Sequence, residues 1–256
     1  MKPLALLDAR EVRFVLLDID DTLTTHGKLG AQAYAALEAL QRAGKRVVPV
    51  TGRPAGWCDH IARMWPVDAV VGENGAFYFW FASGKLAKRF VDDERTRVRQ
   101  RRELQKLAEA ILRQVPGAAL ASDQPYRETD LAIDYCEDVP PLPDEAVERI
   151  VALMHGAGLS AKVSSIHVNG WLGRYDKLAT ARALFAERFG VDLGAANHHV
   201  VYAGDSPNDA PMFDFFDNSV AVANVRRFPG LQPKYVTESE AGAGFAELAA
   251  HLLRGP

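Results

Sequence analysis

The feature that most constrains the fold is residues 14–23, where an apolar strand runs directly into a cluster of acids. Residues 14–17 are all apolar or aromatic, a pattern typical of a strand buried on both faces of a parallel sheet. Asp18, Asp20 and Asp21 follow within four positions. Carboxylates this close repel one another, so a divalent cation and a nearby lysine are the usual compensation. Ligand sites of open α/β sheets lie at the carboxyl ends of the strands, so we expect Asp18 and Asp20 to form the reactive centre.

Length and composition describe an ordinary globular protein. The chain has 256 residues, 48% hydrophobic and 25% charged, enough for one large core plus a smaller lobe. The formal net charge of -3 gives no general attraction to nucleic acid, and no apolar run approaches the roughly 20 residues of a membrane span. Cys58 and Cys136 lack metal-ligand spacing and are expected to be reduced thiols. We therefore expect a cytoplasmic protein with no nucleic-acid or membrane partner.

Both ends of the chain alternate between strands and helices, which is typical of a parallel α/β sheet. Near the N-terminus, helices are expected at 30–43 and 54–64, with strands at 46–50 and 69–71. Near the C-terminus, helices are expected at 176–189, 209–216 and 244–253, with strands at 199–203, 219–222 and 235–236. The two segments are predicted to build one core domain, residues 1–84 and 170–256.

The middle of the chain has a different order of elements. After an aromatic hairpin at 76–91, the pattern predicts a helix at 93–114, strands at 118–121 and 130–136, a helix at 144–155, and strands at 159–163 and 166–168. This order describes an α+β lobe inserted between the halves of the core, and we assign it residues 85–169.

Four groups of polar residues stand at the predicted strand ends or helix starts. They are Asp18 and Asp20; Thr51, Gly52 and Arg53; Lys177; and Asp205, Asn208 and Asp209. Phosphoryl transfer needs positioning and charge neutralisation more than covalent chemistry from the protein. One carboxylate can attack phosphorus, a second can carry the proton, and a hydroxyl and a lysine can hold the phosphoryl oxygens. A further acid can anchor Mg²⁺.

These groups, in this order, resemble the four motifs of the haloacid dehalogenase (HAD) superfamily over the whole core. The resemblance implies that Asp18 is the nucleophile and Asp20 the general acid/base, and that Thr51, Gly52 and Lys177 bind the phosphoryl group. It also implies a Mg²⁺ ion held by Asp18, the backbone carbonyl of Asp20, and Asp205, with support from Asn208 and Asp209. An acid at Asp20 favours phosphoester hydrolysis or phosphomutase chemistry over dehalogenation. Asp21 stands where the family usually has glycine, and we expect it to be a turn residue.

The inserted lobe resembles the type IIB cap found in sucrose-phosphatase, mannosyl-3-phosphoglycerate phosphatase and Cof-like hydrolases. Its order of elements fits this cap better than the other cap that occurs at the same place. Such caps close over small molecules and exclude water. The resemblance thus implies a small phosphorylated substrate, such as a sugar phosphate.

Four further residues are candidates for substrate contact: Asn74, Arg53, His26 and Arg127. Each has an ordinary structural alternative, such as an ion pair for Arg127 or an exposed loop for His26. His167 and Trp171 fit packing roles better than catalytic ones, and the arginines between 95 and 102 fit a solvated helix face.

The sequence therefore predicts an α/β Mg²⁺-dependent phosphatase that forms an aspartyl-phosphate. A sugar phosphomutase and a non-catalytic ligand-binding protein of the same fold remain alternatives. Entry of isotope-labelled oxygen from water into phosphate distinguishes the hydrolase from the mutase. Inactivity across a broad panel of phosphate esters would favour the binding protein.

Overall fold

The computed structural model describes residues 1–164 and 166–254, and their strands form three sheets. The largest is a six-stranded parallel sheet in the order β1-β13-β12-β11-β2-β3. Its strands are β1 (Lys2–Pro3), β2 (Phe14–Leu17), β3 (Arg46–Pro49), β11 (Val200–Gly204), β12 (Asn218–Ala221) and β13 (Tyr235–Val236). The predicted central sheet is confirmed, while β1, which pairs with β13 at one edge, was not anticipated.

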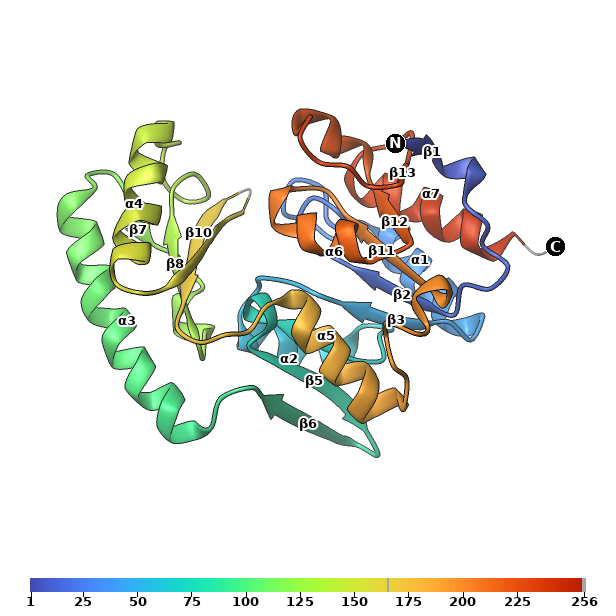
Figure 1. The fold of residues 1–256 in the computed structure, drawn as a ribbon, viewed down its shortest axis with the longest axis horizontal. Coiled ribbons are helices and arrows are strands. Elements are labelled where there is room, and N and C mark those ends of the chain that lie inside the picture. The colour runs from blue at the N-terminus through green and yellow to red at the C-terminus, as the bar shows by residue number, and fades with distance from the viewer. Residues whose placement is uncertain (165, 255–256) are drawn as a thin grey trace.

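Helices cover both faces of this sheet, as Figure 1 shows. One face packs on α1 (Ala31–Arg42) and α7 (Ala241–Leu253), and the other on α5 (Lys177–Leu184) and α6 (Ala210–Phe215). In β2, Val15 and Leu17 face the first helix pair and Leu16 faces the second, and all three are fully buried. The uniformly apolar run before Asp18 thus reflects burial on both faces.

A three-stranded antiparallel sheet lies beside the central one. It contains β4 (Val70–Gly72), β5 (Phe77–Ala82) and β6 (Lys85–Phe90), and α2 (Ala55–Met64) packs against it. We expected residues 69–71 to extend the parallel sheet, but only a single bridge, Val50 to Val71, joins them to it. The chain turns back immediately after β4, so β5 supplies most of its pairing, while on the other side the Thr51 N–H donates to the Val71 carbonyl at 2.9 Å.

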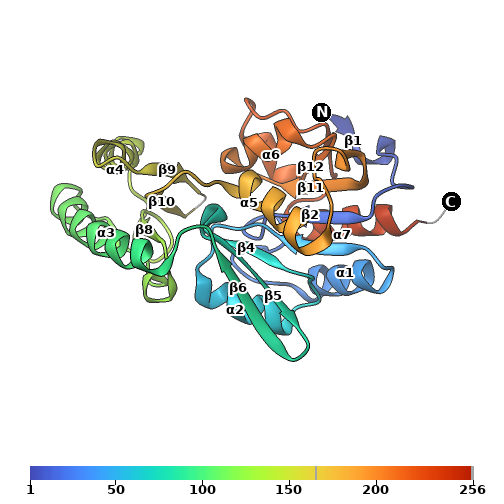
Figure 2. The same ribbon diagram turned by 60° about the horizontal axis from the view of Figure 1, so that its bottom comes forward.

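A second lobe is built by residues 94–171. Its antiparallel sheet has the order β7-β8-β10-β9, and its strands are β7 (Ala119–Leu120), β8 (Asp130–Asp134), β9 (Ser160–Val163) and β10 (His167–Trp171). Helices α3 (Glu94–Gln114) and α4 (Asp144–Gly156) cover the face that points away from the core (Figures 1 and 2). Leu131, Ile133 and Val168 pack under these helices, so the alternate residues of β8 and β10 are on the face toward the core. No helix within the described residues has the length and apolarity to cross a membrane.

Candidate active site

The carboxyl ends of adjacent strands gather the predicted residues at one edge of the central sheet. Strand β2 lies between β11 and β3, with Leu17 opposite Ala203 on one side and Pro49 on the other. The residues that follow these strand ends include Asp18, Asp205 and Thr51. Parallel pairing in this register is therefore what brings together residues nearly 190 positions apart in the chain.

Lys177 joins two of the acids. Its Nζ donates to Asp18 Oδ1 at 2.7 Å and to Asp209 Oδ1 at 2.9 Å, and all three residues are buried. Burial opposes the charge of Lys177, but Asp18 and Asp209 outweigh it and raise the lysine pKa. Helix α5 begins at Lys177, where the Asp176 side chain accepts from the Ala179 N–H as an N-cap.

Asp209 organises the loop after β11. Its two oxygens accept from four donors: Lys177 Nζ, the Tyr202 hydroxyl, and the backbone N–H groups of Asp205 and Ser206. A side chain on Gly204 would have its Cβ 2.6 Å from Asp209 Oδ2, so only glycine fits at this strand end. With four donors already bound, the Asp209 carboxylate fixes the positions of its neighbours.

Asp18 and Asp205 have strongly perturbed acidities. Burial is the main cause for both, because it disfavours the charged form. It raises the pKa of Asp18 to about 7 although Lys177 opposes the shift, and it raises the pKa of Asp205 to about 9 with the further repulsion of Asp209 and Asp18. Asp205 Oδ1 accepts from the Thr22 hydroxyl at 3.1 Å. The cluster thus carries more negative charge than the one lysine neutralises.

Asp21 adopts a left-handed backbone conformation that glycine reaches most easily. Its φ is +55°, and the Asn224 side chain donates to its carbonyl oxygen at 2.8 Å. Aspartate tolerates left-handed conformations better than most residues. The predicted role of Asp21 as a turn residue is consistent with this geometry.

A cleft of about 410 Å³ lies between the central sheet and the second lobe. Its lining residues are Asp18, Asp20, Gly52, Arg53, Asn74, Arg127, Ser164, Ile166, His167, Asn169, Ser206 and Asn208. The lining residues come from both lobes, so Asp18 and Asp20 face a cleft that the second lobe covers.

The proposed substrate contacts divide into three cases. His26 is exposed and does not line the cleft. Arg127 lines it, but its guanidinium is engaged by Asp123, Asp130 and the Gly52 carbonyl. The Asn74 side-chain Nδ2 is buried on the cleft wall and has no hydrogen-bond partner within the described residues.

Several cleft residues were not identified from the sequence. His167, for which we favoured packing, is buried and lines the cleft together with Ser164, Ile166 and Asn169. A signal was present in the alternation of β8 and β10, where polar Asp130, Asp134, His167 and Asn169 alternate with apolar residues. Polar residues on the inner face of a sheet indicate that this face meets a site.

Glu73 connects the two lobes. This fully buried carboxylate accepts from Ala55 N and Glu128 N at 2.9 Å, from Thr129 N at 2.6 Å, and from the Thr129 hydroxyl. Burial, reinforced by Asp130, raises its pKa to about 7. Because Ala55 belongs to α2 and Thr129 to the second lobe, Glu73 fixes the lobe on the core.

Comparison with known proteins identifies the class. The haloacid dehalogenase-like hydrolase family model matches residues 15–96 and 179–248, so the chain belongs to that family. Phosphoglycolate phosphatase of Haloarcula marismortui is 28% identical over 238 residues, 92% of this chain and 95% of the relative. That of Pyrobaculum neutrophilum is 29% identical over 248 residues, 95% of this chain and 96% of the relative.

Solved structures share the complete fold. A Thermoplasma acidophilum protein superposes with a TM-score of 0.72 at 16% identity, covering 94% of this chain and 98% of its own. Synechocystis sucrose-phosphatase gives 0.63 at 17% identity, with coverage of 95% and 98%. A HAD subclass IIB sugar phosphatase gives 0.64 at 14% identity, with coverage of 94% and 98%. The chain thus has the fold of a HAD subclass IIB sugar phosphatase, and its family and its phosphatase relatives support a phosphoric monoester hydrolase.

Proposed function

We propose that this phosphatase hydrolyses small phosphate monoesters with the help of Mg²⁺, through an aspartyl-phosphate formed on Asp18. The observation that carries the proposal is the position of Asp18, which lines the cleft and is bound by Lys177 at 2.7 Å. A lysine beside a nucleophilic carboxylate can hold the phosphoryl oxygens as Asp18 approaches phosphorus. Thr51 and Gly52 follow the neighbouring strand and are the further candidates for binding the phosphoryl group.

The reaction has two steps. An oxygen of Asp18 forms a bond to phosphorus while the bond from phosphorus to the ester oxygen breaks, and Asp20 gives its proton to the departing oxygen. Water then attacks the phosphoryl group on Asp18, Asp20 takes its proton, and phosphate leaves with the carboxylate restored. The second lobe excludes other water from the cleft while the acyl phosphate exists.

The donor set fits a divalent cation. Asp18, Asp205 and Asp209 each offer a carboxylate oxygen, and these oxygens lie within 4.8 Å of one another. The raised pKa values of Asp18 and Asp205 are typical of carboxylates crowded without enough positive charge. Asp18, the carbonyl of Asp20, and Asp205 would hold Mg²⁺, with Asn208 and Asp209 in support. When bound, Mg²⁺ supplies charge neutralisation to the phosphoryl oxygens.

The sequence places the cap at residues 85–169, but β6 (Lys85–Phe90) pairs with β5 beside the core and β10 extends to Trp171. We therefore propose residues 94–171 as the cap and residues 1–93 and 172–256 as the catalytic core. The cleft supports this division, because Asp18 and Gly52 line it from the core and His167 and Asn169 from the lobe. Phosphoglycolate is the first substrate to test, because the two phosphatases compared above span nearly the whole chain. Sugar phosphates are the second class, since the fold is that of the sugar phosphatases.

Replacement of Asp18 by Asn tests the mechanism directly. We expect Asp18→Asn to abolish hydrolysis of p-nitrophenyl phosphate and of phosphoglycolate while the protein stays folded by circular dichroism. Asp217→Asn, at an exposed acid, serves as the matched control and should retain activity. EDTA should abolish the activity of the wild type, and added Mg²⁺ should restore that activity. Most of the activity surviving in Asp18→Asn would exclude Asp18 as nucleophile, and label from water absent from the released phosphate would favour the mutase.

A further inference from the structure

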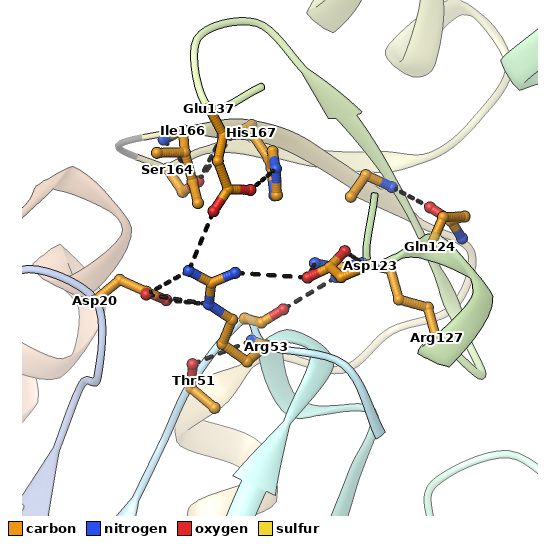
Figure 3. A network of polar contacts seen from close by, with 12 residues as sticks. Asp20, Thr51, Arg53, Asp123, Gln124, Arg127, Glu137, Ser164, Ile166 and His167 are labelled. Atoms are coloured by element: carbon orange, nitrogen blue, oxygen red, sulfur yellow. Dashed lines mark hydrogen bonds and ion pairs between the residues drawn. The ribbon is translucent and has the colours of Figure 1, made fainter. Parts of the chain in front are cut away.

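One arginine connects Asp20 to the second lobe. The Arg53 side chain is only 6% exposed, and it binds both carboxylate oxygens of Asp20. Nε donates to Oδ1 and Oδ2 at 3.0 Å each, and Nη2 donates to Oδ1 at 2.8 Å (Figure 3). A planar guanidinium that holds a carboxylate in this way fixes its orientation as well as its position.

The same guanidinium faces two carboxylates of the second lobe. Nη1 lies 3.6 Å from Asp123 Oδ2, and Nη2 lies 3.6 Å from Glu137 Oε1. Glu137 is in turn 2.8 Å from His167 Nε2, so a chain of polar contacts runs from β10 through Glu137 and Arg53 to Asp20 (Figure 3). We call these four residues, Asp20, Arg53, Glu137 and His167, the Arg53 bridge.

The charge of the buried Arg53 guanidinium is balanced by carboxylates from both lobes. Burial opposes the charge of the guanidinium, and Asp20, Glu137 and Asp123 together overcome it and raise the pKa of Arg53. Removing one partner of a buried charged group is strongly destabilising because the charge stays buried. The Trp57 ring lies 4.3 Å from the guanidinium carbon and packs against the side chain, while the backbone N–H of Arg53 donates to Thr51 Oγ1.

All three nitrogens of the Arg53 guanidinium face protein carboxylates. Nε is shared between the two oxygens of Asp20, Nη2 faces Asp20 and Glu137, and Nη1 faces Asp123. A substrate anion would compete with these carboxylates for the five N–H donors of the guanidinium. This arrangement suits a residue that acts through Asp20 better than the substrate contact expected from the sequence.

We propose that Arg53 is a positioning residue that orients Asp20 for proton transfer, and that Glu137 makes this orientation depend on the second lobe being packed on the core. The inference rests on the proposed function, because it takes Asp20 as the acid/base. Proton transfer requires the acid within about 2.6–3.2 Å of the departing oxygen, so a rotated carboxylate donates poorly. Without Glu137, the guanidinium loses a contact that fixes its plane, and Asp20 loses its alignment in turn.

The experiment compares two esters that differ in their need for acid. p-Nitrophenolate departs with little protonation, whereas the alkoxide of glycerol 2-phosphate requires a proton. Misplacement of a reacting group by about 1 Å costs about 10²-fold, and acid catalysis contributes about 10²–10⁴-fold. The step with water is common to both esters, so kcat/KM is compared, because it reports only the formation of the aspartyl-phosphate. We therefore expect Arg53→Gln to lower kcat/KM for glycerol 2-phosphate about ten- to a hundredfold more than kcat/KM for p-nitrophenyl phosphate. Glu137→Gln should also lower the rate on glycerol 2-phosphate more than the rate on p-nitrophenyl phosphate, but by a smaller factor.

Arg63→Gln is the matched control, because Arg63 is a half-exposed arginine of the neighbouring helix α2 and pairs with Asp59. It should leave both rates unchanged. Equal losses of kcat/KM on the two esters in Arg53→Gln, or losses that come from KM alone, would overturn the positioning role. If Arg53→Gln does not fold, Glu137→Gln decides: a selective loss on the alkyl ester supports the proposal and an unchanged ratio overturns it. A wild type inactive on both esters would refute the proposed function, and this role with it.

Discussion

Replacement of Asp205 by Asn should make the metal-free protein more stable and leave it unable to respond to Mg²⁺. Asp205 is buried, and its pKa is raised from 3.8 to about 9 by burial and by the charges of Asp209 and Asp18. A raised carboxyl pKa means that the native state binds more protons than the unfolded state between these two values. In EDTA this residue therefore lowers stability progressively as the pH rises from about 4 to about 9.

The magnitude at neutral pH follows from the shift. About three pKa units separate the ordinary value of 3.8 from pH 7, and each is worth about 1.4 kcal/mol, so Asp205 costs about 4 kcal/mol there. Asparagine keeps an oxygen to accept from Thr22, but its buried amide loses about 1–2 kcal/mol if it finds no acceptor. We expect a net gain of about 2–3 kcal/mol in unfolding free energy for Asp205→Asn at pH 7.

Urea denaturation in EDTA at pH 5, 7 and 8 measures this difference, which should grow with pH. Mg²⁺ at a hundred times its dissociation constant should then stabilise the wild type by about 2.7 kcal/mol and leave Asp205→Asn unchanged. The exposed Asp217→Asn serves as control and should behave as the wild type. The reasoning fails if Asp205→Asn is the less stable protein in EDTA, or if it still responds to Mg²⁺.

Two further substitutions test contacts that hold the segments around the site together. Thr129→Val removes the hydroxyl donor to buried Glu73 and should lower the unfolding free energy by about 1–2 kcal/mol. Thr129→Ser retains a hydroxyl and should keep the stability of the wild type. Equal stability of the two variants in urea would contradict this expectation. Gly75→Ala places a Cβ 2.2 Å from the Asp176 carbonyl oxygen at a φ of +107°, so we expect a loss of about 1–3 kcal/mol in stability. The clash is at the start of α5, so it should displace Lys177, and kcat should fall together with the stability. An unchanged kcat would show that Lys177 keeps its place.

The sequence was informative wherever a local pattern carried the signal. The apolar run before Asp18 predicted a strand buried on both faces, and the alternation at both ends of the chain predicted the parallel sheet, which the structure confirms. The polar residues after these strands could be expected to meet, because parallel strands end at one edge of a sheet. The left-handed φ of Asp21 also agrees with a turn preference that is local to the chain.

Contacts between lobes had no such local signal. Nothing in the sequence connects Glu73 with Thr129, which is 56 positions away. It assigned residues 69–71 to the parallel sheet because a short apolar run has the same appearance in either sheet, and the hairpin with β5 decided otherwise. His167 was interpreted as a packing residue because nothing in its neighbourhood indicates what lies opposite β10.

What the sequence by itself determined is the family, because Asp18, Asp20, Lys177 and Asp205 stand at strand ends or a helix start in the order of the haloacid dehalogenase motifs. What only the tertiary structure decided is how that site is neutralised and covered. Lys177 is shared by Asp18 and Asp209, and Arg53 is shared by carboxylates from both lobes. The reason is physical: burial and the distance between charges set electrostatic free energies, and both are properties of the packed chain rather than of spacing along it.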